Sequence, residues 1–441
     1  MARLHPAQAV VLGFASAVAA GTLLLLLPIS RAGDGGATVL EALFTAVSAV
    51  CVTGLIVVDT PTYWSGFGQV VILALIQVGG FGIMTLASLL GLLISHRLGL
   101  RTRLTTAAET KSLGLGDVRT VIVGVAKVSL LIEGATAIIL AARLAIGYDE
   151  PVPRALWLGV FHSVSAFNNA GFALYSDSLI RFVTDPWVSL PIAAAVILGG
   201  IGFPVLFELQ RNLRRPSRWT IHTKITLLGT AVLLVGGSAF VLTAEWSNPG
   251  TLGPLGVPGK LLAGFFQGVM PRTAGFNSLD IAQLNTGTWL GTDVLMFIGG
   301  GSAGTAGGIK ITTFTVLLFV IYSEVRGDDD TTVFGRRIST GAQRQALSVA
   351  LLGVAAVVLP AIVFAMTTPF TLDEILYEVI SAFATVGLST GITGDLPTAH
   401  QLVLVALMFV GRTGTVTLAT ALALRHRDRL YRFPEERPII G

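Results

Sequence analysis

The sequence predicts an all-α polytopic membrane protein, built from four tandem helix–pore-loop–helix repeats with eight transmembrane helices around a common centre. Three observations lead to this prediction: an apolar composition, eight long apolar stretches, and four short segments that each align on one glycine. The placement of lysine and arginine then indicates which ends of the predicted helices share a side of the membrane.

The composition excludes most classes of soluble protein. Of the 441 residues, 53% are hydrophobic and 12% are charged, whereas soluble domains have about 25% charged residues. So few charges cannot cover a soluble globule of this size, which excludes a cytosolic enzyme, a disordered protein and a nucleic-acid binder. Cys51 is the one cysteine, so the chain forms no intrachain disulfide. No two of the six histidines are spaced three or four residues apart, so the sequence offers no histidine-based metal motif.

Eight apolar stretches approach the roughly 20 residues that a transmembrane helix needs. They run near 8–28, 69–95, 121–144, 187–207, 224–244, 289–322, 346–367 and 401–424. Arg3 precedes the first stretch, as in a signal peptide, but the apolar part continues to Pro28. This is longer than the roughly 7–15 residues of a signal-peptide core, so we expect a retained helix.

Lysine and arginine gather in alternate connections between these stretches. The N-terminus, the C-terminal tail and the segments 96–119, 208–224 and 323–344 together hold 20 of the 29 cations. With eight passes, all of these segments lie on one side of the membrane. Because cationic loops are retained in the cytoplasm, both termini are predicted to be cytoplasmic at the plasma (inner) membrane.

Between each odd helix and the next even helix lies a segment too short to span the membrane. The four segments align without gaps on one glycine, with an aromatic residue ten positions before it. The glycines are Gly54, Gly171, Gly275 and Gly387, and the aromatic residues are Phe44, Phe161, Phe265 and Tyr377. Three segments also have Ser-Ala six and five positions before the glycine. The pattern predicts a short re-entrant helix followed by a glycine turn.

A second glycine motif follows in each even helix, 24 to 28 residues after the turn glycine. It reads Gly79-Gly80-Phe-Gly82, Gly199-Gly200-Ile-Gly202, Gly299-Gly300-Gly-Ser302 and Gly411-Arg412-Thr-Gly414. Small residues also serve ordinary helix packing in membranes, but four motifs in register favour a fourfold repeat. The predicted repeats are A at 1–100, B at 101–215, C at 216–335 with a broken second helix, and D at 336–424, followed by a cytoplasmic tail at 425–441.

Four equivalent turns that meet at one axis are suited to a cation. Non-helical backbone at membrane depth is tolerated where it is buried in protein or lines a water-filled cavity. A short helix that enters from outside points its negative C-terminal end inward, and glycine lets the turn adopt a positive φ so that carbonyl oxygens face the axis. Rings of carbonyls replace the hydration shell of potassium. None of the four turns carries a carboxylate, which disfavours a filter made of acidic side chains.

The third even helix is interrupted by a glycine-rich run at 299–308, with six glycines in ten residues. Each glycine costs a helix about 1 kcal/mol relative to alanine, so the run predicts a break in mid-membrane. Close helix packing is one alternative reading. A phosphate-binding loop is another, although Lys310 does not directly follow a glycine as the P-loop pattern requires.

These motifs resemble the membrane subunits of the Trk/Ktr/HKT superfamily of potassium transporters over residues 8–424, and the length of the chain resembles the KtrB type. The resemblance implies a central channel-like pore with a selectivity filter formed by Val52, Thr53, Gly54, Asn169, Ala170, Gly171, Thr273, Ala274, Gly275, Thr385, Val386 and Gly387. Plant members that prefer sodium have serine at the first filter glycine, so Gly54 implies a preference for potassium. Asn169-Ala170 departs furthest from the Thr-Val-Gly string of potassium channels.

The resemblance also implies that the glycine-rich run is an intramembrane gate beneath the filter. The residues concerned are Gly299, Gly300, Gly301, Ser302, Gly304, Gly307 and Gly308, together with Lys310 and Arg412. An arginine within a transmembrane helix normally faces a cavity or a partner, and the resemblance makes Arg412 an electrostatic barrier to conduction. Lys310 either faces the same vestibule or reaches the cytoplasmic interface. Glu133, a lone acid in the third helix, is expected to be structural, with Lys127 as a candidate partner.

The remaining expectations concern ions and partners, and they follow from the resemblance. Potassium is the transported ion, sodium is a candidate activator, and the chain itself binds no nucleotide. The expected partners are a second copy in a homodimer, a cytosolic ring of KtrA-type RCK subunits that bind ATP or ADP, and membrane lipids, with no nucleic acid. The run Asp328-Asp329-Asp330 beside Arg326 is either part of the RCK contact or a solvated loop.

Two other classes of function were weighed against this one. A secondary carrier often has inverted repeats, whereas four units that each cross twice keep the same orientation. An integral-membrane enzyme needs clustered His, Asp or Glu at membrane depth, and the sequence does not supply such a cluster. The sequence therefore favours a transport protein and not an enzyme.

Overall fold

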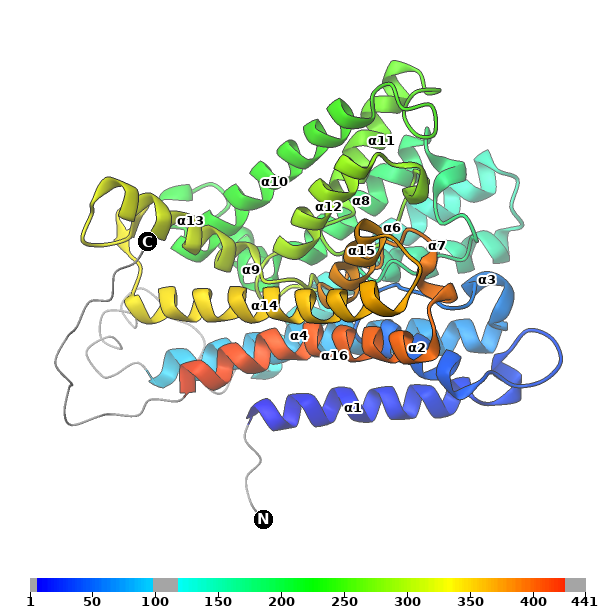
Figure 1. Ribbon diagram of the computed structural model, residues 1–441, viewed down its shortest axis with the longest axis horizontal. Helices are drawn as coiled ribbons and strands as arrows, with labels where there is room; N and C mark the ends of the chain where they lie inside the picture. Colours follow the sequence, from blue (N-terminus) through cyan, green and yellow to red (C-terminus); the bar gives the residue numbers. More distant parts are fainter. Residues whose placement is uncertain (1–5, 98–117, 425–441) are drawn as a thin grey trace, which may run out of the picture.

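The computed structural model describes residues 6–97 and 118–424, which form an almost entirely helical protein. Most of the long helices run side by side along the long axis of the molecule (Figure 1). Within the described residues there is one small sheet, an antiparallel hairpin of β1 (Thr332–Val333) and β2 (Arg336–Arg337). The all-α fold class predicted from the sequence is confirmed.

Each predicted repeat contains a long helix, a short helix and a second long element. The first long helices are α1 (Pro6–Leu25), α6 (Val118–Gly147), α10 (Ile221–Glu245) and α14 (Thr340–Thr367). The short helices are α2 (Val39–Val50), α7 (Val152–Phe167), α11 (Val257–Val269) and α15 (Leu372–Phe383). The second long elements are α4 (Gly66–Arg97), α8 (Pro186–Ile201) with α9 (Phe203–Asn212), α12 (Thr286–Ile298) with α13 (Ile311–Arg326), and α16 (Thr398–Leu424).

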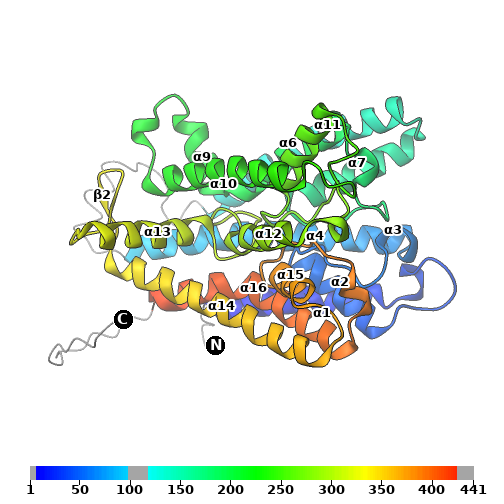
Figure 2. The same ribbon diagram turned by 45° about the horizontal axis from the view of Figure 1, so that its top comes forward.

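Single helical turns complete the connections. They are α3 (Thr60–Tyr63), η1 (Pro28–Ser30), η3 (Ile180–Phe182), η4 (Pro216–Arg218), η5 (Ile281–Gln283) and η6 (Ile392–Asp395). The hairpin and the connection between α9 and α10 lie at the end of the molecule opposite to α3 (Figure 2). Arg3, the predicted boundary between repeats A and B at residue 100, and the tail at 425–441 lie outside the described residues.

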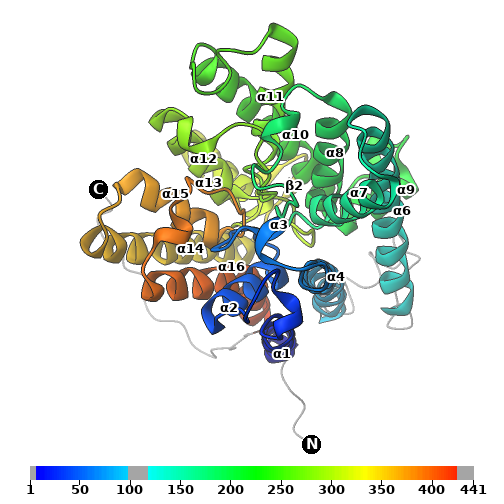
Figure 3. The same ribbon diagram turned by 90° about the vertical axis from the view of Figure 1, so that its right-hand side faces the viewer.

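Viewed along the long axis, the four repeats surround a common centre in chain order (Figure 3). Five elements pass a test of length and hydropathy for crossing a membrane: α4, α6, α10 and α14 singly, and α8 with α9 as a bent pair. The other three predicted passes correspond to α1, to α12 with α13, and to α16. Every one of the eight predicted passes therefore has a helical counterpart.

Local sequence determines where the short helices begin. Glu41 and Glu374 accept hydrogen bonds from the backbone N–H groups of Thr38 and Thr371 at 2.7 and 2.9 Å, which forms a capping box in α2 and in α15. Such boxes satisfy the free N–H groups of the first turn. α7 and α11 have proline in the first turn instead, where the missing N–H costs nothing.

The second glycine motif lets the long helices pack directly against the ends of the short ones. A Cβ atom on the first glycine of the motif would collide with a carbonyl oxygen near the end of the short helix, four residues before the turn glycine. The pairs are Gly79 with Val50, Gly199 with Phe167, and Gly411 with Phe383. In repeat C the corresponding Gly299 lies in the helix break and approaches Gly307 instead. Close helix packing and a fourfold repeat were two alternative explanations of this glycine motif, and the structure shows close packing at the repeated positions.

One predicted helix needs correction, because the apolar stretch 187–207 is not straight. α8 and α9 meet at Gly202 with a bend of 97°. Gly202 has a φ of 101°, which glycine adopts without strain, and Pro204 then starts the first turn of α9. The Phe203 N–H donates to the Ala303 carbonyl of repeat C at 3.3 Å. The bend thus makes room for the broken helix of the next repeat.

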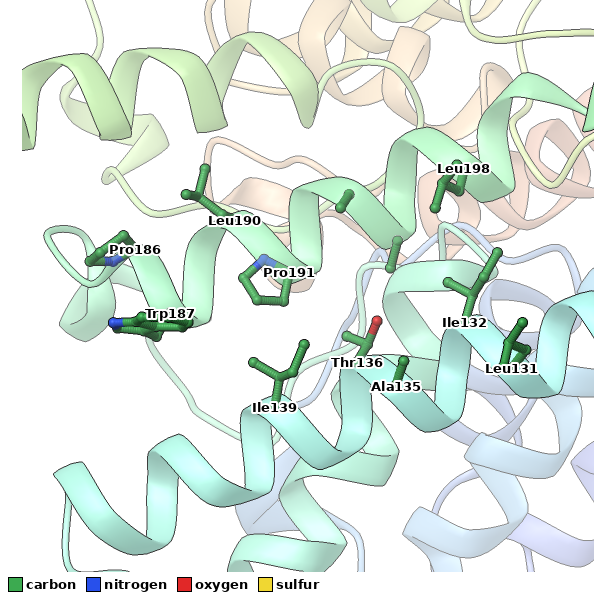
Figure 4. A pocket seen from close by; sticks show the side chains of 12 residues that line it. Leu131, Ile132, Ala135, Thr136, Ile139, Pro186, Trp187, Leu190, Pro191 and Leu198 are labelled. Atoms are coloured by element: carbon green, nitrogen blue, oxygen red, sulfur yellow. The ribbon is translucent and has the colours of Figure 1, made fainter. Parts of the chain in front are cut away.

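A groove of about 590 Å³ lies between α6 and α8. Side chains from both helices point into it (Figure 4). Its lining is apolar apart from the Thr136 hydroxyl and the indole nitrogen of Trp187, and no charged residue within 6–97 and 118–424 contributes to it. A groove with this lining suits hydrocarbon and cannot hold an ion, so the functional site lies elsewhere.

Candidate functional site

The four turns that follow the short helices share one unusual backbone conformation. φ is 56° at Val52, 59° at Asn169, 73° at Thr273 and 51° at Thr385, and the glycine two residues later also has a positive φ, between 71° and 95°. For β-branched valine and threonine a positive φ is an outlier, with a cost of order 1–3 kcal/mol. Three such outliers, with Asn169 in the same conformation in the fourth turn, indicate a geometry that the surrounding fold imposes on every turn.

The sign of φ alternates along each turn. The middle residue of each turn, which is Thr53, Ala170, Ala274 or Val386, does not have a positive φ. This alternation prevents each turn from continuing as a helix or as a strand.

The four turns close into a ring. Each turn glycine faces the carbonyl oxygen of the middle residue in the next repeat, so closely that a Cβ atom there would strike it. The pairs are Gly54 with Ala170, Gly171 with Ala274, Gly275 with Val386, and Gly387 with Thr53. Repeat D thus returns to repeat A. We call residues 52–54, 169–171, 273–275 and 385–387 the glycine ring; it contains all twelve residues singled out in the sequence.

Serine side chains hold three of the four turns from behind. Ser48 Oγ donates to the Leu55 carbonyl at 2.7 Å and accepts the Gly54 N–H at 3.0 Å. Ser165 Oγ donates to the Phe172 carbonyl at 2.8 Å, and Ser381 Oγ accepts the Gly387 N–H at 3.1 Å. The Ser-Ala pattern of the sequence is therefore a structural support for the turns.

Repeat C lacks this serine and has a different turn. Val269 occupies the position of the serine. The Ala274 N–H donates to the carbonyl of the residue four positions earlier, whereas the N–H of the middle turn residue in each other repeat donates to the carbonyl of the residue five positions earlier. Arg272, directly before the turn, is 6% exposed, and its Nη2 reaches Thr230 Oγ1 at 3.5 Å. Its Nε has no hydrogen-bond partner within the part of the chain that the structure describes. The sequence analysis did not single out Arg272, although a cation inside a short apolar segment marks it.

A cavity of about 410 Å³ lies on one side of the glycine ring. Its wall includes all four ring glycines and the loops that follow the turns. Asp59, Asp177 and Asp280 contribute carboxylates from three repeats, and no lysine or arginine of the described residues lines it. Acidic walls of low dielectric raise the local concentration of cations, so this cavity favours the approach of a cation to the ring.

The broken helix of repeat C lies against the other side of the ring. α12 ends at Ile298 and α13 begins at Ile311, and we call residues 299–310 between them the glycine loop. The Gly307 N–H donates to Thr273 Oγ1 at 3.2 Å, and Thr305 Oγ1 donates to Asn169 Oδ1 at 3.0 Å. A Cβ atom on Gly307 would strike the Thr385 side chain. The loop therefore contacts the first ring residue of three repeats.

Backbone bonds anchor the glycine loop to the bend in repeat B. The Gly301 N–H donates to the Gly200 carbonyl at 2.8 Å, and the Thr305 N–H donates to the Gly199 carbonyl at 3.1 Å. Ser302 Oγ bonds with Thr312 Oγ1 of α13 at 2.8 Å. The other glycines of the predicted gate pack within this loop or against repeat B, and they are Gly299, Gly300, Gly304 and Gly308.

Two cations bind the loop directly beneath the ring. Arg412 of α16 is 3% exposed and donates from Nη1 to the Thr305 carbonyl. Lys310 Nζ donates to the carbonyls of Ala306 and Gly307. No salt bridge found among the described residues includes either cation. Lys310 thus folds back onto the glycine loop of which it is the last residue.

Glu133 has a structural setting. It accepts hydrogen bonds from Gln77 Nε2 and Asn168 Nδ2, both at 3.2 Å, and it does not pair with Lys127. Gln77 belongs to α4 and Asn168 directly precedes the glycine ring. Glu133 therefore ties repeats A and B together behind the ring.

Comparisons with known proteins agree with this architecture. The sequence matches the TrkH family, described as cation transport protein, over residues 21–431. The Ktr system potassium uptake protein B of Bacillus subtilis is 41% identical over 100% of this chain and 97% of its own length. The protein of the same name in Vibrio alginolyticus is 36% identical, over 98% of this chain and 94% of its own length. The potassium/sodium uptake protein NtpJ of Enterococcus hirae is 34% identical, over 100% of this chain and 98% of its own length.

A solved structure shares the fold. The crystal structure of the potassium transporter TrkH from Vibrio parahaemolyticus superposes with a TM-score of 0.70 over 95% of this chain and 85% of its own, at 18% sequence identity. The resemblance predicted from the sequence is confirmed, including the similarity to the KtrB type. The relatives are transport proteins and not enzymes. This chain is thus a multi-pass membrane protein that belongs to the TrkH family of cation transport proteins.

Proposed function

We propose that this chain takes up potassium through a channel-like pore whose selectivity filter is the glycine ring. The observation that carries this proposal is the closed ring of four strained turns, each of which presents backbone carbonyls. Carbonyl rings replace the hydration shell of potassium. The Bacillus and Vibrio relatives are named as potassium uptake proteins, which supports the same ion here.

Uptake in this proposal is passive and driven by the membrane potential. A potential of 100 mV is worth about 2.3 kcal/mol per charge, which corresponds to roughly fiftyfold accumulation. Gly54 at the first filter position favours potassium over sodium, as the resemblance to the superfamily implies. In this proposal sodium activates the transport of potassium. The name of the Enterococcus relative, a potassium/sodium uptake protein, supports a test of this role.

The glycine loop is the gate in this proposal. It contacts the first ring residue of three repeats, so an ion leaving the ring meets the loop first. Arg412 and Lys310 donate to three consecutive carbonyls of the loop, those of residues 305–307. Two positive charges at this depth oppose a cation while the loop is in place. Displacing the loop together with these charges opens the path.

The proposed regulation lies at the end of the molecule with the hairpin, which we place in the cytoplasm together with both termini. A ring of KtrA-type RCK subunits binds ATP or ADP and docks there, while this chain binds no nucleotide. The Ktr system names of the Bacillus and Vibrio relatives support such a partnership. Asp330 pairs with Arg337 of the hairpin at 2.9 Å, and Asp328 and Asp329 are exposed, so the acidic run is available to a partner. Two copies form a homodimer in which each protomer has its own pore.

The proposal is tested by cation flux into liposomes that contain the purified chain, with potassium, rubidium, sodium and lithium compared at one imposed voltage. We expect potassium and rubidium to enter well ahead of sodium and lithium. Equal entry of sodium and potassium would be consistent with a pore but would overturn the proposed selectivity for potassium. No entry of any cation, with or without an RCK partner, would overturn the channel and favour a secondary carrier.

A further inference from the structure

One position of the repeat places a buried side chain behind the exit of each turn. It lies nine residues before the turn glycine, and it is occupied by Thr45, His162, Phe266 and Glu378 in repeats A to D. All four side chains are buried, with at most 3% of the residue exposed. Two of them accept a hydrogen bond from the backbone that leaves the glycine ring, and the other two do not.

His162 of α7 holds the exit of the repeat B turn. Its Nδ1 lies 2.8 Å from the Leu158 carbonyl. Because a carbonyl oxygen only accepts, Nδ1 carries the proton and Nε2 is left as an acceptor. Nε2 accepts the N–H of Leu174, three residues after Gly171, at 3.3 Å. The ring stacks on Tyr175 with 5.4 Å between the centroids, which fixes its orientation.

Glu378 of α15 performs the same task in repeat D with different chemistry. Its Oε1 accepts the N–H of Thr390, three residues after Gly387, at 3.1 Å. The same oxygen accepts from Ser389 Oγ, and Oε2 accepts from Thr393 Oγ1 at 2.9 Å. An imidazole in repeat B and a carboxylate in repeat D thus accept a hydrogen bond from the backbone N–H at the equivalent position of each repeat. We call this arrangement the brace.

The brace occurs in opposite quarters of the ring. The glycine ring closes in the order A, B, C, D, so repeats B and D face each other across it. Phe266 in repeat C has no acceptor, and within the described residues no hydrogen bond joins Thr45 to Val57, the corresponding residue of repeat A. The two braces therefore restrain one diagonal of the ring.

We infer that His162 and Glu378 are positioning residues that set the diameter of the glycine ring and thereby its preference for potassium over sodium; this inference rests on the proposed function. A backbone held at positive φ persists only where its surroundings over-determine it. The brace restrains the chain three residues beyond each turn glycine. Without it, the carbonyls of repeats B and D are free to move inward and coordinate the smaller sodium ion, in the view in which filter size contributes to selectivity.

The test compares the ratio of potassium to sodium flux in liposomes for five variants. His162→Phe introduces the side chain that repeat C has at this position, and Glu378→Leu removes both acceptor oxygens. We expect each to lower the ratio about tenfold, the effect of losing one buried hydrogen bond. His162→Gln restores an acceptor near Nε2 and is expected to keep most of the ratio. Thr45→Val, the matched control in repeat A, is expected to leave the ratio unchanged.

Glu378→Gln covers the case in which Glu378→Leu does not fold. It keeps one oxygen for Thr390 and loses the acceptor for Thr393, so we expect a drop of about threefold. An unchanged ratio in folded His162→Phe and in the folded Glu378 variants would overturn the inference. An equal drop in Thr45→Val would also overturn it, because repeat A has no brace.

Hydrogen exchange of the Leu174 and Thr390 amides separates this inference from the proposed function. We expect both amides to be protected in the wild type, and each to lose protection only in the variants of its own brace. If wild-type liposomes admit no potassium, the proposed function and the selectivity role both fail, and the exchange data still report the bonds. Potassium-selective wild-type flux with unprotected amides would overturn the brace alone.

Discussion

At the residue scale, the two cations beneath the ring are the most unusual side chains of the protein. Arg412 is buried, has no ion-pair partner among the described residues, and leaves Nε and Nη2 without hydrogen-bond partners. A buried arginine that satisfies backbone carbonyls in place of a carboxylate keeps its full positive charge toward its surroundings. In the proposed pore, Arg412 therefore opposes a cation that leaves the glycine ring on this side.

Replacing Arg412 with glutamine is expected to raise potassium flux about tenfold, because one unit charge near the pore is worth on the order of 1–2 kcal/mol at an effective dielectric constant of 20. Glutamine can still donate to the Thr305 carbonyl, so the loop keeps a hydrogen bond. Voltage-driven rubidium uptake into liposomes measures the effect. Arg412→Lys, which keeps the charge, serves as the control, and an equal rise in both variants would contradict the electrostatic explanation.

A single methyl group at the ring tests the close contact between repeats. Gly275→Ala places a Cβ against the Val386 carbonyl at a φ of 72°, so we expect at least a tenfold loss of potassium flux from protein that still elutes as folded. Gly236→Ala is the control, because none of the described residues comes within 4 Å of a Cβ there, and its flux is expected to match the wild type. Undiminished flux in Gly275→Ala would show that the ring is wider than the contact implies.

The twelve ring residues were predictable from the sequence because a gap-free alignment of four segments shows them directly. His162 and Glu378 were not singled out, because the four repeats have different residues at this position: a threonine, a histidine, a phenylalanine and a glutamate. The role of each side chain depends on a hydrogen bond to a backbone N–H twelve residues later in the chain. Such a bond leaves no pattern in a single sequence. The geometry was needed to show that an imidazole and a carboxylate serve one purpose.

At the scale of elements, the broken helix of repeat C and the bent helix of repeat B form one structure. The glycine loop is bonded to residues 199–203 by several backbone hydrogen bonds, which include those from Gly301 and Thr305 and the one that Phe203 donates to Ala303. A movement of the loop must therefore break bonds to repeat B, or take the bend at Gly202 with it. Gating in this protein is expected to involve both elements.

Replacing the six glycines of 299–308 with alanine is expected to abolish regulated flux. Alanine favours helix over glycine by about 1 kcal/mol per residue, and Cβ atoms on Gly301 and Gly307 would strike the Ile201 and Ala384 carbonyls. The loop then cannot occupy its present place beneath the ring. The readout is potassium flux with and without an RCK partner and nucleotide; unchanged regulation would show that the loop is not the gate.

The sequence predicted the break in repeat C but not the bend in repeat B. Six glycines in ten residues cannot be mistaken for a helix, whereas Gly202 and Pro204 are only two residues in an otherwise apolar stretch. The pair was nevertheless informative, because a glycine followed closely by a proline is a common helix boundary. What decides the bend is the backbone of residues 302 and 303, and a contact from another repeat is invisible in the local sequence.

At the scale of the whole molecule, the orientation in the membrane is still a prediction and can be tested by labelling. Cys51 is fully buried, so single cysteines can be introduced at exposed positions. Asp34 is exposed in the connection between α1 and α2, and Asp329 is exposed in the connection between α13 and the hairpin. We expect Asp34→Cys to react with an impermeant maleimide on intact cells and Asp329→Cys to react only after permeabilisation. The reverse pattern would overturn the predicted orientation.

The closure of the ring within a single chain changes what one mutation can do. In a channel assembled from four identical subunits, a substitution in the filter appears four times, so its effect is multiplied around the axis. Here each quarter has its own codons, and Asn169, Val269 and Arg272 show that the quarters already differ. If the glycine ring is the filter, as we propose, single substitutions alter it in steps of one quarter. Natural selection can then adjust conductance and selectivity more finely than in a symmetric assembly.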